Sequence, residues 1–305
     1  MKKLLYLIFI LPVLFIASCS DDDNTDFDIP ELVTANSVQF TLVHDASPTV
    51  GKYAQISVAG KKIAIDWGDG TVEKYSTKEL RSIEHIYTSQ VDEYTVKVWT
   101  EHLTDLHVYN GNGTIISSSH IKIGHAPELT HLVIVKCPYL TTIDVTNCPA
   151  LEYLNCYENK LESLDVSNNK KLKLINCDSN NLSSIDISSN TILNTLNCAH
   201  NQLNMLDISK NKELETLICY GNNIVTLDVS ENKELTKLLC GSNQLNDLAL
   251  NQMFEDLSTS SYIKTSEVIK YIIQFAGNPG AENCNKDIII NKGWSIIDHV
   301  IEKPE

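Results

Sequence analysis

The chain has 305 residues, and its 39 acidic side chains outnumber its 24 basic ones, which gives a formal net charge of −15 at pH 7. This excess of negative charge repels nucleic acid and anionic membrane surfaces, so we expect neither as a partner. The nine cysteines first suggest disulfides, and their spacing along the chain tests that interpretation.

Residues 1–18 have the layout of a secretory signal, in which two lysines precede an apolar run that ends in small residues. The run is too short and wrongly flanked for a dependable membrane span. The tetrad Ile-Ala-Ser-Cys that ends at Cys19 resembles a bacterial lipobox. This resemblance implies cleavage before Cys19, lipidation of its sulfur with diacylglycerol, and anchoring in the outer membrane through acyl chains. An ordinary signal peptide with an incidental cysteine is the alternative.

An acidic tether is expected at residues 19–35. Ser20 is followed by Asp21, Asp22 and Asp23, and this run resembles the acidic export tag with which Bacteroidetes-type lipoproteins are sent to the cell surface. A solvated, disordered segment would have the same composition. We expect the tether to hold the protein on the outside of the outer membrane.

Residues 36–102 read as short alternating strands, and KIAIDWGDGTVEKY has the composition of a β-hairpin. WGDGT, the H-x-Y of His85 and Tyr87, and a later Y-x-V-x-V resemble the PKD family of immunoglobulin-like sandwiches. The resemblance implies a small β-sandwich that acts as a spacer or an adhesive module. A cation held by Asp66 and Asp69 is the sharper interpretation of the acidic turn, and a turn-forming role is the one we expect.

A 21-residue period dominates residues 103–250. Copies of L-x-x-L-x-C-x-x-N-x-L-x-x-L-D-[VI]-S-x-N-x-x begin at Leu151, Leu172, Leu193, Leu214 and Leu235, and less regular units begin at Leu129 and Leu103. A fixed period of this length predicts a solenoid, in which each unit buries its apolar edge against its neighbours. The pattern resembles the leucine-rich repeat family in its short bacterial form.

Each repeat begins with a strand that has one buried face. Leu154 and Cys156 alternate with Tyr153, Asn155 and Tyr157, which is the period of two that a half-buried strand shows. Stacked copies of this strand would form a parallel sheet with a spacing of about 4.8 Å. The fold class expected for the whole chain is therefore mainly β, a small sandwich followed by a solenoid.

Five cysteines occupy the same inward position of the repeat, namely Cys156, Cys177, Cys198, Cys219 and Cys240. Their Cβ atoms would stack about 4.8 Å apart, beyond the roughly 3.5–4.5 Å that a disulfide prefers. We expect buried free thiols; a metal ladder is the alternative, although no C-x-x-C pair or matching histidine supports it. Cys137, Cys148 and Cys284 are also expected to be buried.

Two polar side chains also recur in every unit. The asparagine after the strand is expected to bond backbone groups where the chain bends, at Asn159, Asn180, Asn201, Asn222 and Asn243. An aspartate between two apolar residues predicts a second short strand on the return side, at Asp144, Asp165, Asp186, Asp207 and Asp228. These carboxylates suit Asx-turns, and a bound row of calcium ions is the functional alternative.

Repetition stops after Leu250, and residues 251–305 are expected to form a C-terminal cap. LNDLALNQMFEDL has the spacing of a helix, VIKYIIQF reads as a strand, and a short helix and a final strand follow the turn GNPG. GNPG, a single cysteine and KGW resemble the ends of related repeat lipoproteins. A cap would shield the apolar edge of the last coil from edge-to-edge association.

No catalytic, metal-protease, phosphate-loop or dinucleotide motif occurs, so we expect neither an enzyme nor a cofactor. The outward positions of the first strand carry aromatic, amide and aliphatic groups with few charges, as recognition surfaces do. The residues expected to bind a ligand are Tyr153, Asn155, Tyr157, Asn176, Asn197, His200 and Tyr220.

Three functions fit this surface. The first is a protein-binding or adhesive surface lipoprotein, which repeat families suggest by analogy. The second is a glycan-binding accessory of a polysaccharide-uptake system, which the tyrosines and the asparagine row favour. The third is a purely structural envelope protein.

Overall fold

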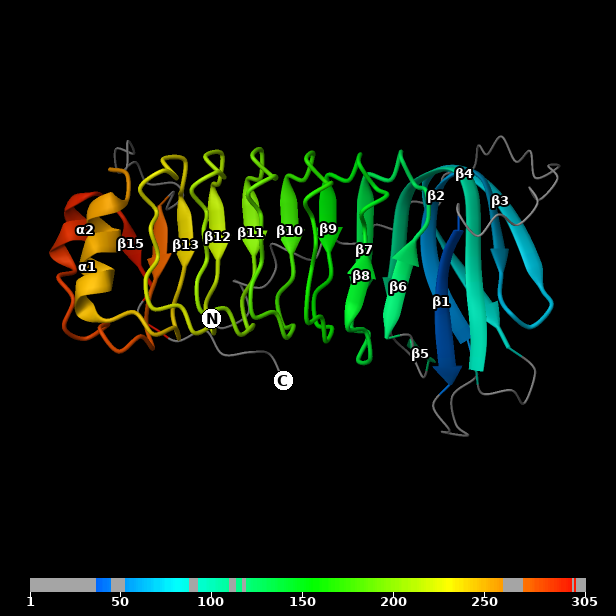
Figure 1. Ribbon diagram of the computed structural model, residues 1–305, viewed down its shortest axis with the longest axis horizontal. Helices are drawn as coiled ribbons and strands as arrows, with labels where there is room; N and C mark the ends of the chain where they lie inside the picture. The colour runs from blue at the N-terminus through cyan, green and yellow to red at the C-terminus, as the bar shows by residue number, and fades with distance from the viewer. Residues whose placement is uncertain are drawn as a thin grey trace.

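The computed structural model describes residues 37–44, 53–87, 93–109, 114–116, 119–259, 271–297 and 299. They form a mainly β molecule in which a parallel solenoid lies between long antiparallel strands at one end and two short helices at the other (Figure 1). Among these residues, no helix is long and apolar enough to cross a membrane.

The N-terminal strands are antiparallel. β2 pairs with β3 and with β4, and β4 also pairs with β1, so the predicted hairpin is present as β2 and β3. The strands are β1 (Ser37–His44), β2 (Tyr53–Asp66), β3 (Val72–Ile86), β4 (Glu93–Tyr109) and β5 (Thr114–Ile116).

β2 bends sharply at Gly60, where its registers with both β3 and β4 shift. A Cβ atom on Gly60 would lie 2.2 Å from the carbonyl oxygen of His102, so only glycine allows β4 to approach this closely. Because of the bend, Asp69 in the hairpin turn meets His85 near the end of β3, with Oδ2 and Nε2 2.8 Å apart. The long strands therefore fold over a shared core that contains Trp67.

β4 joins these strands to the solenoid. Its last residues pair in parallel with β7 (His131–Val135), so the degenerate unit at Leu103 supplies the strand of the first coil, as predicted. On the return side, β6 (His120–Ile123) pairs in parallel with β8 (Thr142–Asp144). β4 thus runs unbroken through the predicted domain boundary between residues 102 and 103.

The solenoid sheet is parallel and in register, as the period predicts. Equivalent residues of successive repeats lie side by side, and the inward leucines and isoleucines are fully buried. After β7 its strands are β9 (Tyr153–Asn155), β10 (Leu174–Asn176), β11 (Thr195–Asn197), β12 (Thr216–Ile218) and β13 (Lys237–Leu239).

The prediction of a second strand in every repeat is wrong for the repeats after β8. Leu164 and Val166 are buried and Asp165 is exposed, as expected, but this segment of the later coils is extended chain outside any sheet. The later coils share a single backbone hydrogen bond just before this segment, such as the one from the N–H of Asn181 to the carbonyl oxygen of Leu161, and no ladder follows it. Oδ1 of Asp165 accepts the backbone N–H of Ser167 at 2.9 Å, as Oδ1 of Asp144 in β8 accepts that of Thr146, so this bond is common to both kinds of coil.

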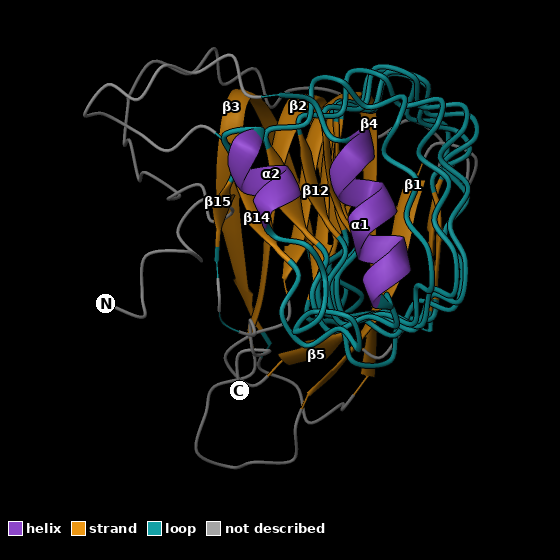
Figure 2. Ribbon diagram, turned by 90° about the vertical axis from the view of Figure 1, so that its left-hand side faces the viewer, coloured by secondary structure: helices purple, strands orange, loops and turns teal. Residues whose placement is uncertain are grey.

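The C-terminal cap closes the last coil, and its two helices lie across the end of the molecule (Figure 2). Asn246 caps the first helix by accepting the N–H of Ala249, and Met253 and Phe254 are buried against the last coil. β14 extends the solenoid sheet beyond β13, which confirms the expected strand. The elements are α1 (Asp247–Asp256), β14 (Ile272–Gln274), α2 (Asp287–Asn291) and β15 (Ser295–Ile296).

Candidate functional site

The outward side chains of the parallel strands form a surface that we call the sheet face. The register aligns them in three rows that cross the strands. The first row is Asp105, His131, Tyr153, Leu174, Thr195, Thr216 and Lys237; the second is His107, Val133, Asn155, Asn176, Asn197, Ile218 and Leu239; the third is Tyr109, Val135, Tyr157, Asp178, Ala199, Tyr220 and Gly241.

The accessibility of the sheet face changes along the solenoid. His131 is exposed and Tyr153, Asn155 and Tyr157 are half-buried. The expectation of exposed binding residues is wrong farther along, because Asn176, Asn197 and Tyr220 are 5%, 7% and 5% exposed. His200 and the first-row side chains from Leu174 to Lys237 are half-buried. There, outward apolar side chains pack on one another in a second cluster, with Ile297 of the cap against it: Ala199, Ile218, Tyr220 and Leu239.

Rings gather at the accessible part, which we call the aromatic end: His107, Tyr109, His131, Tyr153 and Tyr157. Nδ1 of His107 lies 2.8 Å from the hydroxyl of Tyr109, and the rings of His131 and Tyr153 are 5.8 Å apart. The sequence analysis missed the two residues on β4, because the unit at Leu103 was read only as a degenerate repeat. The signal was present, since LTDLHVY has the same alternation as the later strands.

Asp105 and His131 form an ion pair at the edge of the aromatic end, with Oδ1 and Nδ1 3.1 Å apart. The hydrogen bond to Asp105 raises the pKa of His131 above its ordinary value. Burial alone would raise the pKa of Asp105, but the hydrogen bond with His131 holds it below its ordinary value. Burial lowers the pKa of the neighbouring His107, so that ring is neutral while His131 titrates.

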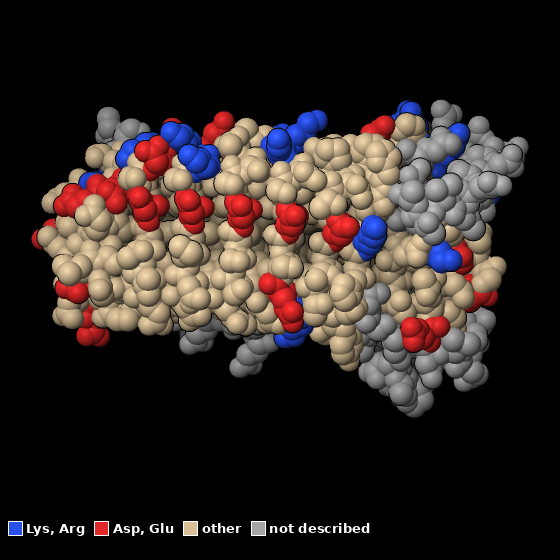
Figure 3. Space-filling view, in the orientation of Figure 1, with Lys and Arg blue, Asp and Glu red and all other residues tan. Residues whose placement is uncertain are grey.

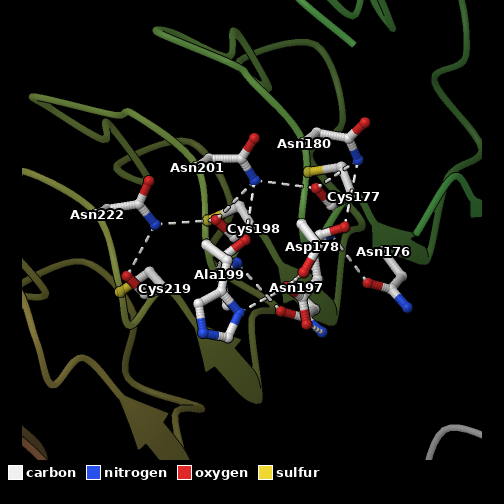
Figure 4. Close-up of polar contacts among 12 residues, drawn as sticks. Asn176, Cys177, Asp178, Asn180, Asn197, Cys198, Ala199, Asn201, Cys219 and Asn222 are labelled. Atoms are coloured by element: carbon white, nitrogen blue, oxygen red, sulfur yellow. Dashed lines mark hydrogen bonds and ion pairs between the residues drawn. The ribbon is translucent and has the colours of Figure 1, made fainter. Parts of the chain in front are cut away.

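A buried carboxylate organises the middle of the sheet face. Asp178 is 5% exposed, and its Oδ1 lies 2.9 Å from the hydroxyl of Ser179 and 3.1 Å from Nδ1 of His200. Its Oδ2 accepts from Nδ2 of Asn197 at 3.4 Å (Figure 4). These residues with Asn176 are the Asp178 cluster.

The Asp178 cluster brings together residues that the sequence predicted separately. The backbone N–H of Asp178 donates to Oδ1 of Asn176 at 3.2 Å, so the two are joined by main chain as well. The ring of His200 meets that of Tyr220 edge-on, with centroids 4.8 Å apart. The sequence analysis gave Asp178 no role, and its partners became visible only in the structure.

In each coil an inward asparagine bonds backbone groups at the turn, and a cysteine thiol fills part of the interior. Nδ2 of Asn180 donates to the carbonyl oxygens of Cys156 and Cys177 at 2.9 and 3.0 Å, and its Oδ1 accepts from the N–H of Leu161. This confirms the structural role expected of these asparagines. The ladder cysteines are free and buried, as predicted, and burial raises the pKa of Cys156 to about 12.

A second asparagine ladder lies on the return side and was missed by the sequence analysis. Its signal is the S-x-N at the end of the repeat, and its members are Asn169, Asn190, Asn211 and Asn232. Each is fully or almost fully buried, and Nδ2 of Asn190 donates to the carbonyl oxygens of Val166 and Asn169. Oδ1 of all four lacks a partner among the described residues.

The aspartates of the return side form an exposed row along the opposite surface of the solenoid (Figure 3). Each accepts the N–H two residues on, as Oδ1 of Asp186 does from Ser188 at 2.9 Å, which confirms the Asx-turns. That backbone hydrogen bond lowers the pKa of Asp186. The described part of the chain contains no group of three or more histidine, cysteine or carboxylate side chains placed to hold a metal ion.

The WGDGT turn and the H-x-Y residues meet in the N-terminal strands. Oδ1 of Asp66 accepts the N–H of Gly68 at 2.8 Å and Oδ1 of Asp69 that of Thr71 at 2.9 Å, which is the turn-forming role expected of them. His85, paired with Asp69, stacks on Trp67 with ring centroids 4.8 Å apart. The predicted lipidation site, Cys19, lies outside the described residues.

No protein-family model and no curated protein matches this chain. Among solved structures, it is similar to the functional domain of InlJ from Listeria monocytogenes, described as including a cysteine ladder. The two are 30% identical over 52% of this chain and 38% of that one, with a TM-score of 0.44.

The internalin InlF of Listeria monocytogenes has a TM-score of 0.42 and is 19% identical over 50% of this chain and 49% of its own. The leucine-rich-repeat protein LIC12759 of Leptospira interrogans has a TM-score of 0.41 and 20% identity over 56% and 49%. These neighbours are bacterial leucine-rich-repeat proteins, and they match the repeat part of this chain. The chain spans less than half of each of them.

Proposed function

We propose that this protein is a cell-surface lipoprotein that binds a protein partner through the aromatic end of the sheet face. The observation that carries the proposal is the gathering of five histidine and tyrosine rings on three neighbouring coils, at the more accessible end of the sheet face. Tyrosine brings a large contact area at little entropic cost, and the adjacent amides bring hydrogen bonds, as in antibody-like binding surfaces.

A glycan ligand is the second candidate, and the contact between ring and amide on one strand favours it. Tyr153 and Asn155 lie on the same side of β9, where a sugar would find a flat ring beside a hydrogen-bonding group. The two candidates share the same surface and differ in the chemistry of the ligand. Both describe a binding role and neither requires a catalytic group or a cofactor.

The lipid anchor at Cys19 and the exterior location belong to the same proposal. The lipobox-like tetrad and the acidic run after it support the anchor and the export. We also assign the N-terminal strands to a PKD-like spacer. The contacts of WGDGT with His85 support that assignment, because they show the motif residues in mutual packing.

The test is to probe protein and glycan arrays with the purified full-length protein, and to repeat the binding with two sets of variants. We expect a protein ligand whose binding is weakened by Tyr153→Ala and Tyr157→Ala, by about 2 kcal/mol or more if either is a hot spot. The matched controls, Asp165→Asn and Asp186→Asn on the opposite surface, should leave it unchanged. Loss of binding in the aspartate set alone would show that the wrong face has been assigned.

A further inference from the structure

We propose that the ligand of the sheet face is an extended polypeptide segment, and that Asn176 donates a hydrogen bond to one of its main-chain carbonyl oxygens. The inference rests on the proposed function, because it names the chemistry of the partner at the same surface.

Asn176 is a fixed donor without an acceptor. Its side chain is 5% exposed, and its orientation is set because Oδ1 accepts the N–H of Asp178 at 3.2 Å. Its Nδ2 has no partner among the described residues, and in Figure 4 this atom points away from the Asp178 cluster and carries no bond. The equivalent nitrogen of Asn197 is already used, since it donates to Oδ2 of Asp178. An oriented donor left unpaired at a surface gains from a ligand that supplies an acceptor.

The amide oxygens and the carboxylate next to Asn176 already accept hydrogen bonds. Oδ1 of Asn155 accepts the N–H of Tyr157 at 3.1 Å, in the same way as Asn176, and the carboxylate of Asp178 accepts from three side chains. A sugar hydroxyl donates a hydrogen bond as well as accepting one, whereas a main-chain carbonyl oxygen only accepts. An unpaired donor whose neighbouring amide oxygen and carboxylate are already engaged suits a group that only accepts, such as the carbonyl.

Charge also selects a neutral acceptor. Asp178 lies beside Asn176, and its carboxylate repels a ligand carboxylate or phosphate that approaches the amide. A peptide carbonyl has a strong dipole and no net charge, so it approaches Asn176 without that penalty. Extended chain offers such carbonyls along its length, whereas those in the interior of a helix are bonded within the helix.

The neighbouring strand supplies the rest of the contact. Tyr153 on β9 and Tyr157 just after it lie on the neighbouring coil, and both are half-buried with surface left to cover. Tyrosine rings pack against planar peptide units and side chains alike. A segment that crosses the strands from the aromatic end would reach Asn176 at the edge of the Asp178 cluster.

The experiment uses the full-length protein and a displayed library of linear peptides. A selected peptide is synthesised with a thioamide, whose sulfur is a weak acceptor, in place of each main-chain amide in turn. We expect one position at which this change weakens binding to the wild-type protein by about threefold to tenfold. At that position the change should have no effect on binding to Asn176→Ala.

Two further variants test whether the coupling between the peptide carbonyl and residue 176 depends on the amide donor. Asn176→Asp keeps the oxygen that accepts from Asp178 and replaces the donor by an acceptor, so it should lose the same coupling as the alanine variant. Thr195→Ala changes a half-buried residue of the adjacent strand on the same face and should retain it. Unfolding curves of all three variants show whether each is folded.

The outcomes separate this inference from the proposed function. A bound peptide with no position coupled to Asn176 overturns the inference and leaves the proposed function standing. Binding to a glycan array without any peptide overturns the inference and transfers the function to the second candidate. Absence of both kinds of binding, with folded protein, overturns the proposed function as well.

Discussion

Asparagine has three different roles in this protein, and the direction of the side chain decides between them. Asn180 points inward and bonds the turn, Asn190 points inward on the return side, and Asn176 points outward on the sheet face. The chemistry of the carboxamide is the same in each case. What differs is the set of backbone groups that the carboxamide can reach. The position of the asparagine in the repeat determines that set.

At the same scale, the ladder thiols should be reduced and should resist polar substitution. Cys198 is fully buried, so Cys198→Ser, which brings a more polar group into the core, should lower the free energy of unfolding by roughly 1–3 kcal/mol. Urea titration measures the change. Alkylation of unfolded protein without reductant should find the ladder cysteines free, and pairwise oxidation would contradict the stacking argument.

The Asp105–His131 pair should make stability depend on pH in two windows. His131 has a raised pKa in the folded state, so its contribution is complete below its ordinary pKa near 6.5 and is lost as pH rises through the folded value. Asp105 has a lowered pKa, so its contribution is present above 3.8 and is lost as pH falls through the folded value. His107, with its lowered pKa, works against the pair in acid.

NMR titration of the His131 ring measures this coupling directly. The Asp105→Asn variant removes the carboxylate and should bring the pKa of His131 down towards its ordinary value. His120→Gln, which changes an exposed histidine of β6, is the control and should leave that titration unchanged. If the pKa of His131 is the same in the wild type and in Asp105→Asn, the ion pair is absent in solution.

At the scale of the element, the sheet consists mostly of three-residue strands, and a left-handed corner follows them in each coil. The corner residue precedes the inward asparagine, or Cys137 in the coil of β7, and its φ is positive in every described repeat from β7 onward. The values are 60° at Lys136, 58° at Glu158, 58° at Ser179, 47° at His200, 68° at Gly221, 50° at Ser242 and 81° at Gly277. This conformation turns the chain so that the asparagine reaches back over the preceding coil, and it strains any residue other than glycine.

Glu158→Gly should therefore stabilise the fold. Relief of strain outweighs the greater freedom of glycine in the unfolded chain, for a net gain of roughly 0.5–1 kcal/mol. The reverse change, Gly221→Ala, should lower stability by roughly 1–2 kcal/mol from strain alone. It also places a Cβ 2.9 Å from Cδ2 of His200. Urea midpoints compare the two variants, and a loss of stability in Glu158→Gly would refute the strain argument.

At the scale of the whole molecule, one sheet passes from the N-terminal strands through the solenoid into the cap. β4 is the link, because its first part pairs with β1 and its last part with β7. Each end of the solenoid is thereby covered, at one end by bent antiparallel strands and at the other by α1 and α2 (Figures 1 and 2). Such closure protects the apolar edges of the end coils from pairing with another chain.

Membrane attachment is a property of the whole molecule that a single residue tests. Cys19→Ala should move the protein from the membrane fraction to the soluble fraction, because no acyl chains would hold it to the bilayer. Cys284→Ala, which removes a cysteine of the cap, is the control and should stay with the membrane. Membrane retention of the Cys19 variant would contradict the anchor, and protease resistance of the wild type on intact cells would contradict an exterior location.

The period of 21 residues was enough to predict the solenoid, its parallel sheet, and the inward thiols and asparagines. These features follow from alternation along the strand and from stacking of identical units, both of which are local and repeated. The turn at WGDGT was readable for the same reason, since Asp66 and Asp69 bond groups only two residues away.

The tertiary structure decided which outward side chains are accessible to solvent and which of them bond one another. The alternation placed Asn176, Asn197 and Tyr220 outward, but whether they meet solvent depends on the side chains of neighbouring coils. The pairing of Asp178 with His200 joins two repeats at positions that differ by one within the repeat unit, which no period reveals. The missing return strands have the same origin. On the return side, the stacking of neighbouring coils decides whether their backbones pair, and after β8 they share single bonds such as that from Asn181 to Leu161.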